Sequence, residues 1–276
     1  MFNAATTGEA EKAVRAAERR KLHVPDEVYE ARRLQTAVFE AGRTPDPGRP
    51  ALPATAAEVA AVIQLHAEAL RLADVTRRAA TLFADEADQR FVSETQAAVP
   101  QWVAGLDKEF CTLLGVVRKA AAKLSQDVTL LDPRRIDWND PVTTAAYTKA
   151  EGAVVQLEQL VSDRSDIAAV AGPDGGRDSA LFSVAALPEP TVQTVMDQGW
   201  QDLHPVIAQW RDLTQQPVAR WVYLVRQQAL TLGLATPGQA RERASCVQLW
   251  RDATMARASA QTLRSAHAQV AQVLRA

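Results

Sequence analysis

The sequence predicts an all-α protein, a long-helix bundle or antiparallel coiled coil with a short N-terminal helical segment. The first observation is composition: of 276 residues, 52 are Ala and only 12 are Gly, and Ala is the strongest helix former. The second is spacing, because apolar residues recur at intervals of three and four over several long segments, as on one face of a helix. The third is that no segment shows the apolar–polar alternation of a half-buried strand.

Residues 1–41 are predicted to form two short helices. Thr6 and Glu9 have the spacing of a capping box at the start of the first helix. Pro25 suits the first turn of the second helix, and Gly42 is typical of the position just after a helix end. We therefore expect an N-terminal helical segment that precedes the main body.

Residues 42–54 are predicted to be an extended linker, because they contain four prolines. A long, coiled-coil-like helical region is expected from 55 to 172. It opens with Thr55 and Glu58, another capping-box pair, and its first apolar seam ends at Glu86, where a charge occupies the next position in register. That seam consists of Val62, Leu65, Ala69, Leu72, Val75, Ala79 and Leu82.

Pro100 is expected to kink or break this long helix. Helical spacing resumes between 102 and 124, and Asp140 with Pro141 predicts the N-cap and first turn of another helix. This helix is expected to end before the glycine-rich segment 172–176. Since that segment lacks the strand–loop–helix order of a phosphate-binding loop, we interpret it as a turn.

Residues 173–276 are predicted to form a C-terminal helical region with a Trp-rich core. Helices are expected to begin at Thr191, Pro217 and Thr236. Four of the six tryptophans lie in this region, where bulky aromatic residues are more often core than a platform for a ligand. They are Trp200, Trp210, Trp221 and Trp250.

The helix that begins at Thr236 has the most regular apolar spacing in the chain and is predicted to be an interaction seam. Its alanines would let a neighbouring helix approach closely. His267 lies in the seam and is interpreted as a polar residue that sets register, the alternative being a pH-sensitive contact. The seam consists of Leu249, Ala253, Ala256, Ala260, Leu263, His267, Val270 and Leu274.

The same helix is basic, although the whole chain has a net charge of only −2. Residues 237–276 contain six arginines and two acidic residues, a local net charge of +4. Arg243, Arg257 and Arg264 share one heptad position, which makes them candidates for contact with a polyanion such as nucleic acid. The alternative is that they pair with acidic residues on a neighbouring helix. Trp250 is the only aromatic residue among them, whereas single-strand binding favours several.

No cofactor, metal ion or catalytic residue is predicted. None of the four histidines has a Glu three residues before it, and no His-Glu-x-x-His sequence occurs. Cys111 and Cys246 are isolated and are interpreted as small buried residues, typical of a reduced compartment. The start of the chain lacks the features of a signal peptide, and no apolar run has the length of a membrane span, so we expect a cytoplasmic protein with no membrane partner.

These observations predict a non-enzymatic structural or interaction protein that works by helix–helix association. We expect a homo-oligomer or a complex with a helical protein partner. The Ala- and Arg-rich composition fits a bacterial or bacteriophage assembly component, an expectation that depends on composition alone. The main alternative is a nucleic-acid-associated protein that uses the basic C-terminal helix. A third hypothesis is an enzyme whose site assembles from distant residues such as Asp202, His204 and Arg211.

Overall fold

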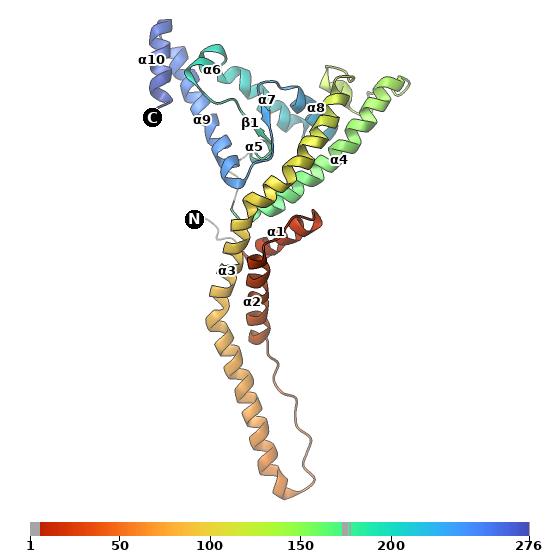
Figure 1. Ribbon diagram of the computed structural model, residues 1–276, viewed down its shortest axis with the longest axis vertical. Helices are drawn as coiled ribbons and strands as arrows, with labels where there is room; N and C mark the ends of the chain where they lie inside the picture. The colour runs from red at the N-terminus through yellow and green to blue at the C-terminus, as the bar shows by residue number, and fades with distance from the viewer. Residues whose placement is uncertain (1–5, 173–175, 177, 276) are drawn as a thin grey trace.

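The protein is built almost entirely of helices, as predicted (Figure 1). The computed structural model describes residues 6–172, 176 and 178–275. In chain order the elements are α1 (Thr7–Arg19), α2 (Asp26–Gly42), η1 (Ala56–Glu58), α3 (Val59–Ala121), η2 (Val128–Leu131), α4 (Pro141–Ala169), α5 (Ser179–Phe182), β1 (Ala185–Ala186), α6 (Val192–Asp197), α7 (Trp200–Asp212), η3 (Leu213–Gln215), α8 (Pro217–Arg226), β2 (Thr231–Leu232), α9 (Pro237–Ser259) and α10 (Leu263–Val273).

Three of the predicted helix starts carry the expected caps. The capping box predicted for Thr55 and Glu58 does not form, because the 3-10 turn η1 precedes α3 and Thr55 makes no side-chain cap hydrogen bond. The Thr6 hydroxyl accepts a hydrogen bond from the Glu9 backbone N–H, and the Glu9 side chain accepts one from the Thr6 N–H, which completes the capping box. Asp140 is the N-cap of α4, and Thr236 forms a capping box at the start of α9. Both caps agree with the prediction. Of the predicted glycine-rich turn, residues 173–175 lie outside the described residues, and Gly172 has a positive φ of 87°.

Helix α3 is the axis of the molecule. It runs for 63 residues, about 95 Å at 1.5 Å per residue. Pro100 lies inside α3 and does not end it, so the break that was one of its two predicted effects does not occur. Figure 1 shows α3 changing direction in its middle, beside α1. We call its residues 59–90 the stalk, and we call the part of the molecule that packs around α3 from Phe91 onward the head.

The head is held together by aromatic residues that come from distant parts of the chain. The second half of α3 packs against α4, and α8 packs against both. Trp221 of α8 meets Phe110 of α3 edge-on at 6.1 Å and Trp210 of α7 at 5.5 Å. The buried Trp250 lies apart from this group and donates its indole N–H to the Pro188 carbonyl. The C-terminal tryptophans therefore pack partly on α3 and do not form one core of their own.

The structure contains one element that the sequence did not predict. Strands β1 and β2 have two residues each and pair antiparallel, with Ala185 opposite Leu232. Two residues are too few to show an alternating pattern. The strand pair joins the segment that follows α5 to the segment that precedes α9. Arg243 donates hydrogen bonds to the carbonyls of Phe182 and Gly233, on either side of this pair.

The prediction of one helical register from Thr236 to Leu274 is wrong. Helix α9 ends at Ser259, and Ala260 is extended with ψ of 138°. Thr262 then caps α10, with the Thr262 hydroxyl accepting from the Ser265 N–H and the Ser265 hydroxyl accepting from the Thr262 N–H. This capping box satisfies backbone groups at the start of a new helix. After the break, α10 packs back against α9.

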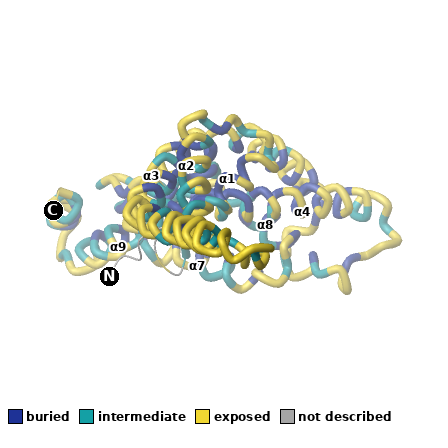
Figure 2. Tube along the Cα trace, turned by 90° about the horizontal axis from the view of Figure 1, so that it is seen from below, coloured by how far each residue is buried: buried dark blue, intermediate teal, exposed yellow. Residues whose placement is uncertain are grey.

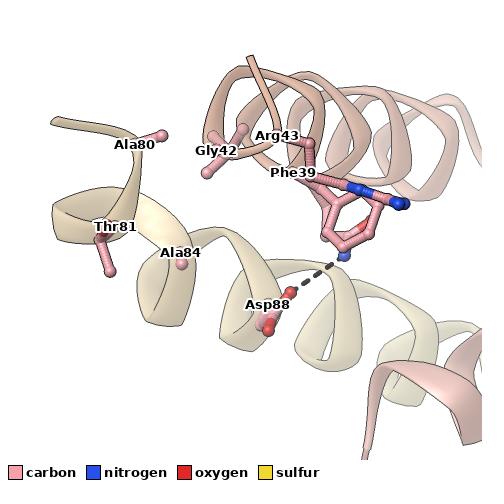
Figure 3. Close-up of a pocket in the computed structure, with 9 residues that line it drawn as sticks. Phe39, Gly42, Arg43, Ala80, Thr81, Ala84 and Asp88 are labelled. Carbon is pink, nitrogen blue, oxygen red and sulfur yellow. Dashed lines mark hydrogen bonds between the residues drawn. The ribbon is translucent and has the colours of Figure 1, made fainter. Parts of the chain in front are cut away.

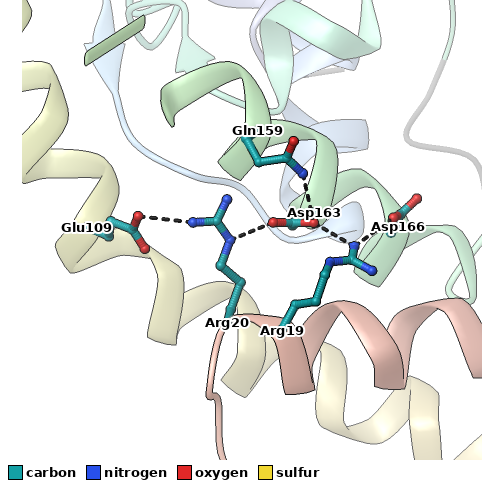
Figure 4. A network of polar contacts seen from close by, with 6 residues as sticks. All are labelled: Arg19, Arg20, Glu109, Gln159, Asp163 and Asp166. Atoms are coloured by element: carbon teal, nitrogen blue, oxygen red, sulfur yellow. Dashed lines mark hydrogen bonds and ion pairs between the residues drawn. The ribbon is translucent and has the colours of Figure 1, made fainter. Parts of the chain in front are cut away.

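Helix α1 is fixed to α4 by an ion-pair network around Asp163 (Figure 4). The Asp163 carboxylate is 2% exposed and accepts from Arg19 at 2.6 Å and from Arg20 at 2.5 Å. Arg20 also pairs with Glu109 of α3 at 3.0 Å, and Arg19 with the exposed Asp166 at 3.3 Å. The network thereby joins α1 to both long helices of the head.

Burial and charge act in opposite directions on Asp163. Removal from water raises the pKa of its carboxyl group, but hydrogen bonds from Arg19 and Arg20 outweigh that effect, and the pKa lies below its ordinary value. The same contact with Asp163 raises the pKa of Arg19. The network therefore stabilises the ionised carboxylate in the folded protein.

Substitution Asp163→Asn is expected to lower the free energy of unfolding by about 2 kcal/mol. This is less than the cost of breaking a fully buried pair, because Arg19 can rehydrate. Urea denaturation followed by circular dichroism measures the change. Asp166→Asn, at an exposed end of the same network, is the control and is expected to cost below about 1 kcal/mol. Equal losses in both variants would contradict the central role of Asp163.

The effect of Asp163 is also expected to depend on pH. Because its pKa is lower in the folded chain than in the unfolded chain, its stabilisation is fully present above the ordinary Asp pKa of about 3.9. It is lost as the pH falls through the lower folded value. The stability difference between the wild type and Asp163→Asn should thus be constant from pH 7 to 5 and shrink below about pH 4. A difference that has already disappeared at pH 6 would contradict this assignment.

Candidate interaction surface

A stripe of large apolar side chains on the stalk has no covering element among the described residues. Its members, Leu65, Leu72, Val75 and Leu82, are 67%, 69%, 52% and 80% exposed, and we call them the stalk stripe. They belong to the first seam predicted from the sequence. Of that seam, Val62 is half-buried, and Ala69 and Ala79 are exposed. Figure 2 shows the stalk coloured as exposed over most of its length.

Helix α2 packs on a different face of the stalk. This face presents the buried Ala80 and Ala87, and the buried Ala73 continues it toward the tip, beyond the end of α2. Ala73 follows Leu72 by one residue, which turns its side chain by about 100° around the helix axis. The small side chains allow close approach, since a Cβ added to Gly42 of α2 would lie 3.8 Å from the Ala80 Cβ. Alanine thus provides the contact within the chain, and the larger leucines are left outside it.

The extended linker also leaves the stripe open. Residues 43–55 run along the stalk, from the end of α2 to the tip of the stalk (Figure 1). Arg77 holds the start of this segment, with hydrogen bonds to the Thr44 carbonyl at 3.0 Å and to Asp46 at 2.7 Å. Leu52 in the linker is itself almost fully exposed.

A groove between α2 and the stalk forms a second candidate surface (Figure 3). Its volume is about 290 Å³, and a hydrogen bond of 3.1 Å between Gln35 and Asp88 crosses one end of it. The Arg43 guanidinium stacks 5.1 Å above the Phe39 ring. Thr81 lines this groove and lies one residue before Leu82 of the stripe, which places the two side chains about 100° apart around the helix axis. The groove and the stripe are therefore separate surfaces.

The predicted C-terminal seam is divided between two helices. Ala253 of α9 and Val270 of α10 are buried where these helices pack together. Leu263, by contrast, is 76% exposed, and His267 is exposed as well. The remaining members, Leu249, Ala256, Ala260 and Leu274, are partly buried. Much of this seam thus closes within the chain.

The three arginines proposed to contact a polyanion do not form a stripe. Arg243 donates to two carbonyls beside the strand pair, and burial lowers the pKa of its guanidinium. Arg257 donates to the carbonyls of Val195 and Met196 near the end of α6. Arg264 lies on α10, beyond the break, where it is exposed.

The residues of the enzyme hypothesis do not converge on a site. The Asp202 side chain accepts from the Gly199 N–H at 2.8 Å at the start of α7. His204 is exposed, with its ring 5.7 Å from that of Trp200. Arg211 forms a two-point ion pair with Asp178 at 2.5 Å.

The two cysteines are less buried than predicted. Cys111 is exposed, because its side chain lies on the outer face of α3, and its thiol lies 3.7 Å from the Asp107 carboxylate. Partial burial and this carboxylate raise the pKa of the Cys111 thiol, which makes it less reactive. Cys246 is half-buried, and burial raises the pKa of its thiol as well.

Within the described residues, no three side chains of the metal-binding types come together. In the same part of the chain, every helix is too short or too polar to cross a bilayer. No protein-family model matches the sequence, and comparisons with curated proteins and with solved structures found no significant match. The geometry of the surface is therefore the basis for any functional argument.

The packing of α2 against alanine residues of the stalk can be tested by substitution. Ala80→Leu is expected to force α2 away from the stalk, at a cost of about 1–3 kcal/mol. Ala79→Leu adds the same atoms one residue earlier, on the exposed face, and should leave α2 in place. Hydrogen exchange of the α2 amides measures the difference. Equal protection of α2 in both variants would contradict the assignment of the buried face.

Proposed function

We propose that this chain is a structural or interaction protein that works by helix–helix association, and that the stalk is the part that associates. The observation that carries the proposal is the stalk stripe. Its leucines repeat at heptad spacing along one helix face, and no described part of the chain covers them. A contiguous exposed apolar surface is typical of a protein–protein contact.

The energetics favour a function in association over a purely internal role. Burying a Leu or Val side chain stabilises a protein by about 1.5–3 kcal/mol. The stripe leaves four such side chains in water, whereas the buried residues Ala80 and Ala87 lie on the face that packs against α2. A second helix packed on the stripe would bury these side chains and add the stabilisation that they do not provide within one chain.

Leu72→Glu is expected to weaken self-association, because a charge would be buried in the centre of the contact. Absolute mass from size-exclusion chromatography with light scattering, over a hundredfold range of concentration, measures the outcome. The wild type should form a defined oligomer, and the variant should dissociate at least about tenfold more readily. A wild type that is monomeric at every concentration would refute self-association.

Ile63→Glu is the matched control. Ile63 is 62% exposed and Leu72 is 69% exposed, and their offset of nine positions places Ile63 on the opposite side of the same helix. The control should keep the wild-type mass. Leu263→Glu on α10 tests the C-terminal seam in the same way, and dissociation by that variant alone would move the contact to α9 and α10.

The nucleic-acid alternative has less support, because Arg243 and Arg257 are engaged by backbone carbonyls of this chain. Titration with a single-stranded oligonucleotide at low salt tests it directly. Binding that weakens steeply as salt rises, and that Arg257→Glu with Arg264→Glu removes, would favour this alternative.

A further inference from the structure

The exposed side of the stalk carries a row of side chains that is longer and more regular than the seam predicted from the sequence. Starting from the stripe and moving in steps of four and three residues, the row passes through Glu68 and ends at Glu86 without a skip. All of its side chains are exposed. We call it the heptad row; it consists of Ala61, Leu65, Glu68, Leu72, Val75, Ala79, Leu82 and Glu86.

We infer that the heptad row pairs with the same row of a second copy of this chain, with the two stalks antiparallel and centred between Leu72 and Val75. This inference rests on the proposed function, and it names the occupant of the stripe. The row is complementary to itself only when one copy is reversed.

The reversed row places large side chains opposite large ones. Leu65 meets Leu82 of the second copy, and Leu72 meets Val75. Each Glu meets an Ala, since Glu68 lies opposite Ala79 and Glu86 lies opposite Ala61. The small methyl group leaves a glutamate room to turn its carboxylate toward water at the edge of the contact.

A parallel pair would place like charges together. In that arrangement Glu68 faces Glu68 and Glu86 faces Glu86, so two of the eight layers would bring carboxylates into contact. Two further layers would pair Ala with Ala and bury little area. Charge and volume therefore both favour the antiparallel arrangement.

Flanking charges agree with the same alignment. Arg78 is one residue before Ala79, so it lies beside the layer that holds Glu68 of the second copy. Its side chain is 79% exposed, and within the described part of the chain its guanidinium pairs at 2.9 Å with Asp74 on its own helix. A guanidinium has further donors for a second carboxylate.

The length of the stalk fits the pairing. In this alignment Val59, the first residue of α3, lies level with Asp88 of the second copy. The two stalks therefore overlap from residue 59 to residue 88. η1 (Ala56–Glu58) of one copy comes level with residues 89–91 of the other, where the head begins at the buried Phe91. Helix α2 lies about 100° away around the axis and leaves the row accessible.

Site-directed disulfide formation tests the orientation. In a background of Cys111→Ser and Cys246→Ala, whose fold is checked by circular dichroism, Leu65→Cys and Leu82→Cys are introduced into two chains with tags of different size. The two chains are co-expressed and oxidised with copper phenanthroline. A cross-link is expected between the two variants, and neither should cross-link to itself. In the proposed pair, 17 residues of axial offset separate like positions, about 25 Å, and a disulfide needs Cβ atoms about 4 Å apart.

The outcomes separate this inference from the proposed function. A Leu65→Cys chain that cross-links to itself would show a parallel pair, which overturns the inference and leaves self-association intact. An oligomer by light scattering without any cross-link in the mixture would place the contact elsewhere and also overturn the inference. A monomer at every concentration would refute both. Ile63→Cys, on the opposite side of the stalk, is the control and should not cross-link in any mixture.

Discussion

The architecture depends on the length of α3. It is a single helix of 63 residues, whereas α2 has 17 and α4 has 29, so no helix in the chain is long enough to cover it. The head uses the second half of α3 as one wall of its core. The first half extends beyond the head as a stalk that α2 covers on one face only. Because a helix cannot bury all its faces against one neighbour, apolar residues of the stalk remain in water.

Two kinds of contact hold the stalk and head in their places. On the stalk, alanines let α2 approach closely, and the contact gains its stability from proximity more than from the area of any single side chain. In the head, α1 is fixed by a buried carboxylate between two arginines. That network sits where α1, α3 and α4 meet, so it sets how the N-terminal helices are positioned beside the bend of α3.

Much of the local structure was accessible from the sequence, because its causes are local. Capping boxes at Thr6 and Thr236, the N-cap at Asp140 and the proline-rich linker depend on residues within a few positions of one another. The break at Ala260 shows the limit of periodicity. The apolar spacing continues across it, but the Thr262–Ser265 capping box begins a new helix there. The contact of α10 with α9 stabilises the turn. The two-residue strands were too short to leave any pattern.

The sequence by itself determined that the protein is helical, that its longest helix follows the proline linker, and that a heptad seam runs along that helix. Which side of the helix stays exposed was decided only by tertiary structure. Ala79 and Ala80 are identical in sequence terms, yet one faces water and the other faces α2. Likewise, Glu68 joins the exposed row because of where α2 packs, whereas a charge in the sequence had indicated the end of a seam. Periodicity specifies faces of a helix, and only packing between distant segments chooses which face is covered.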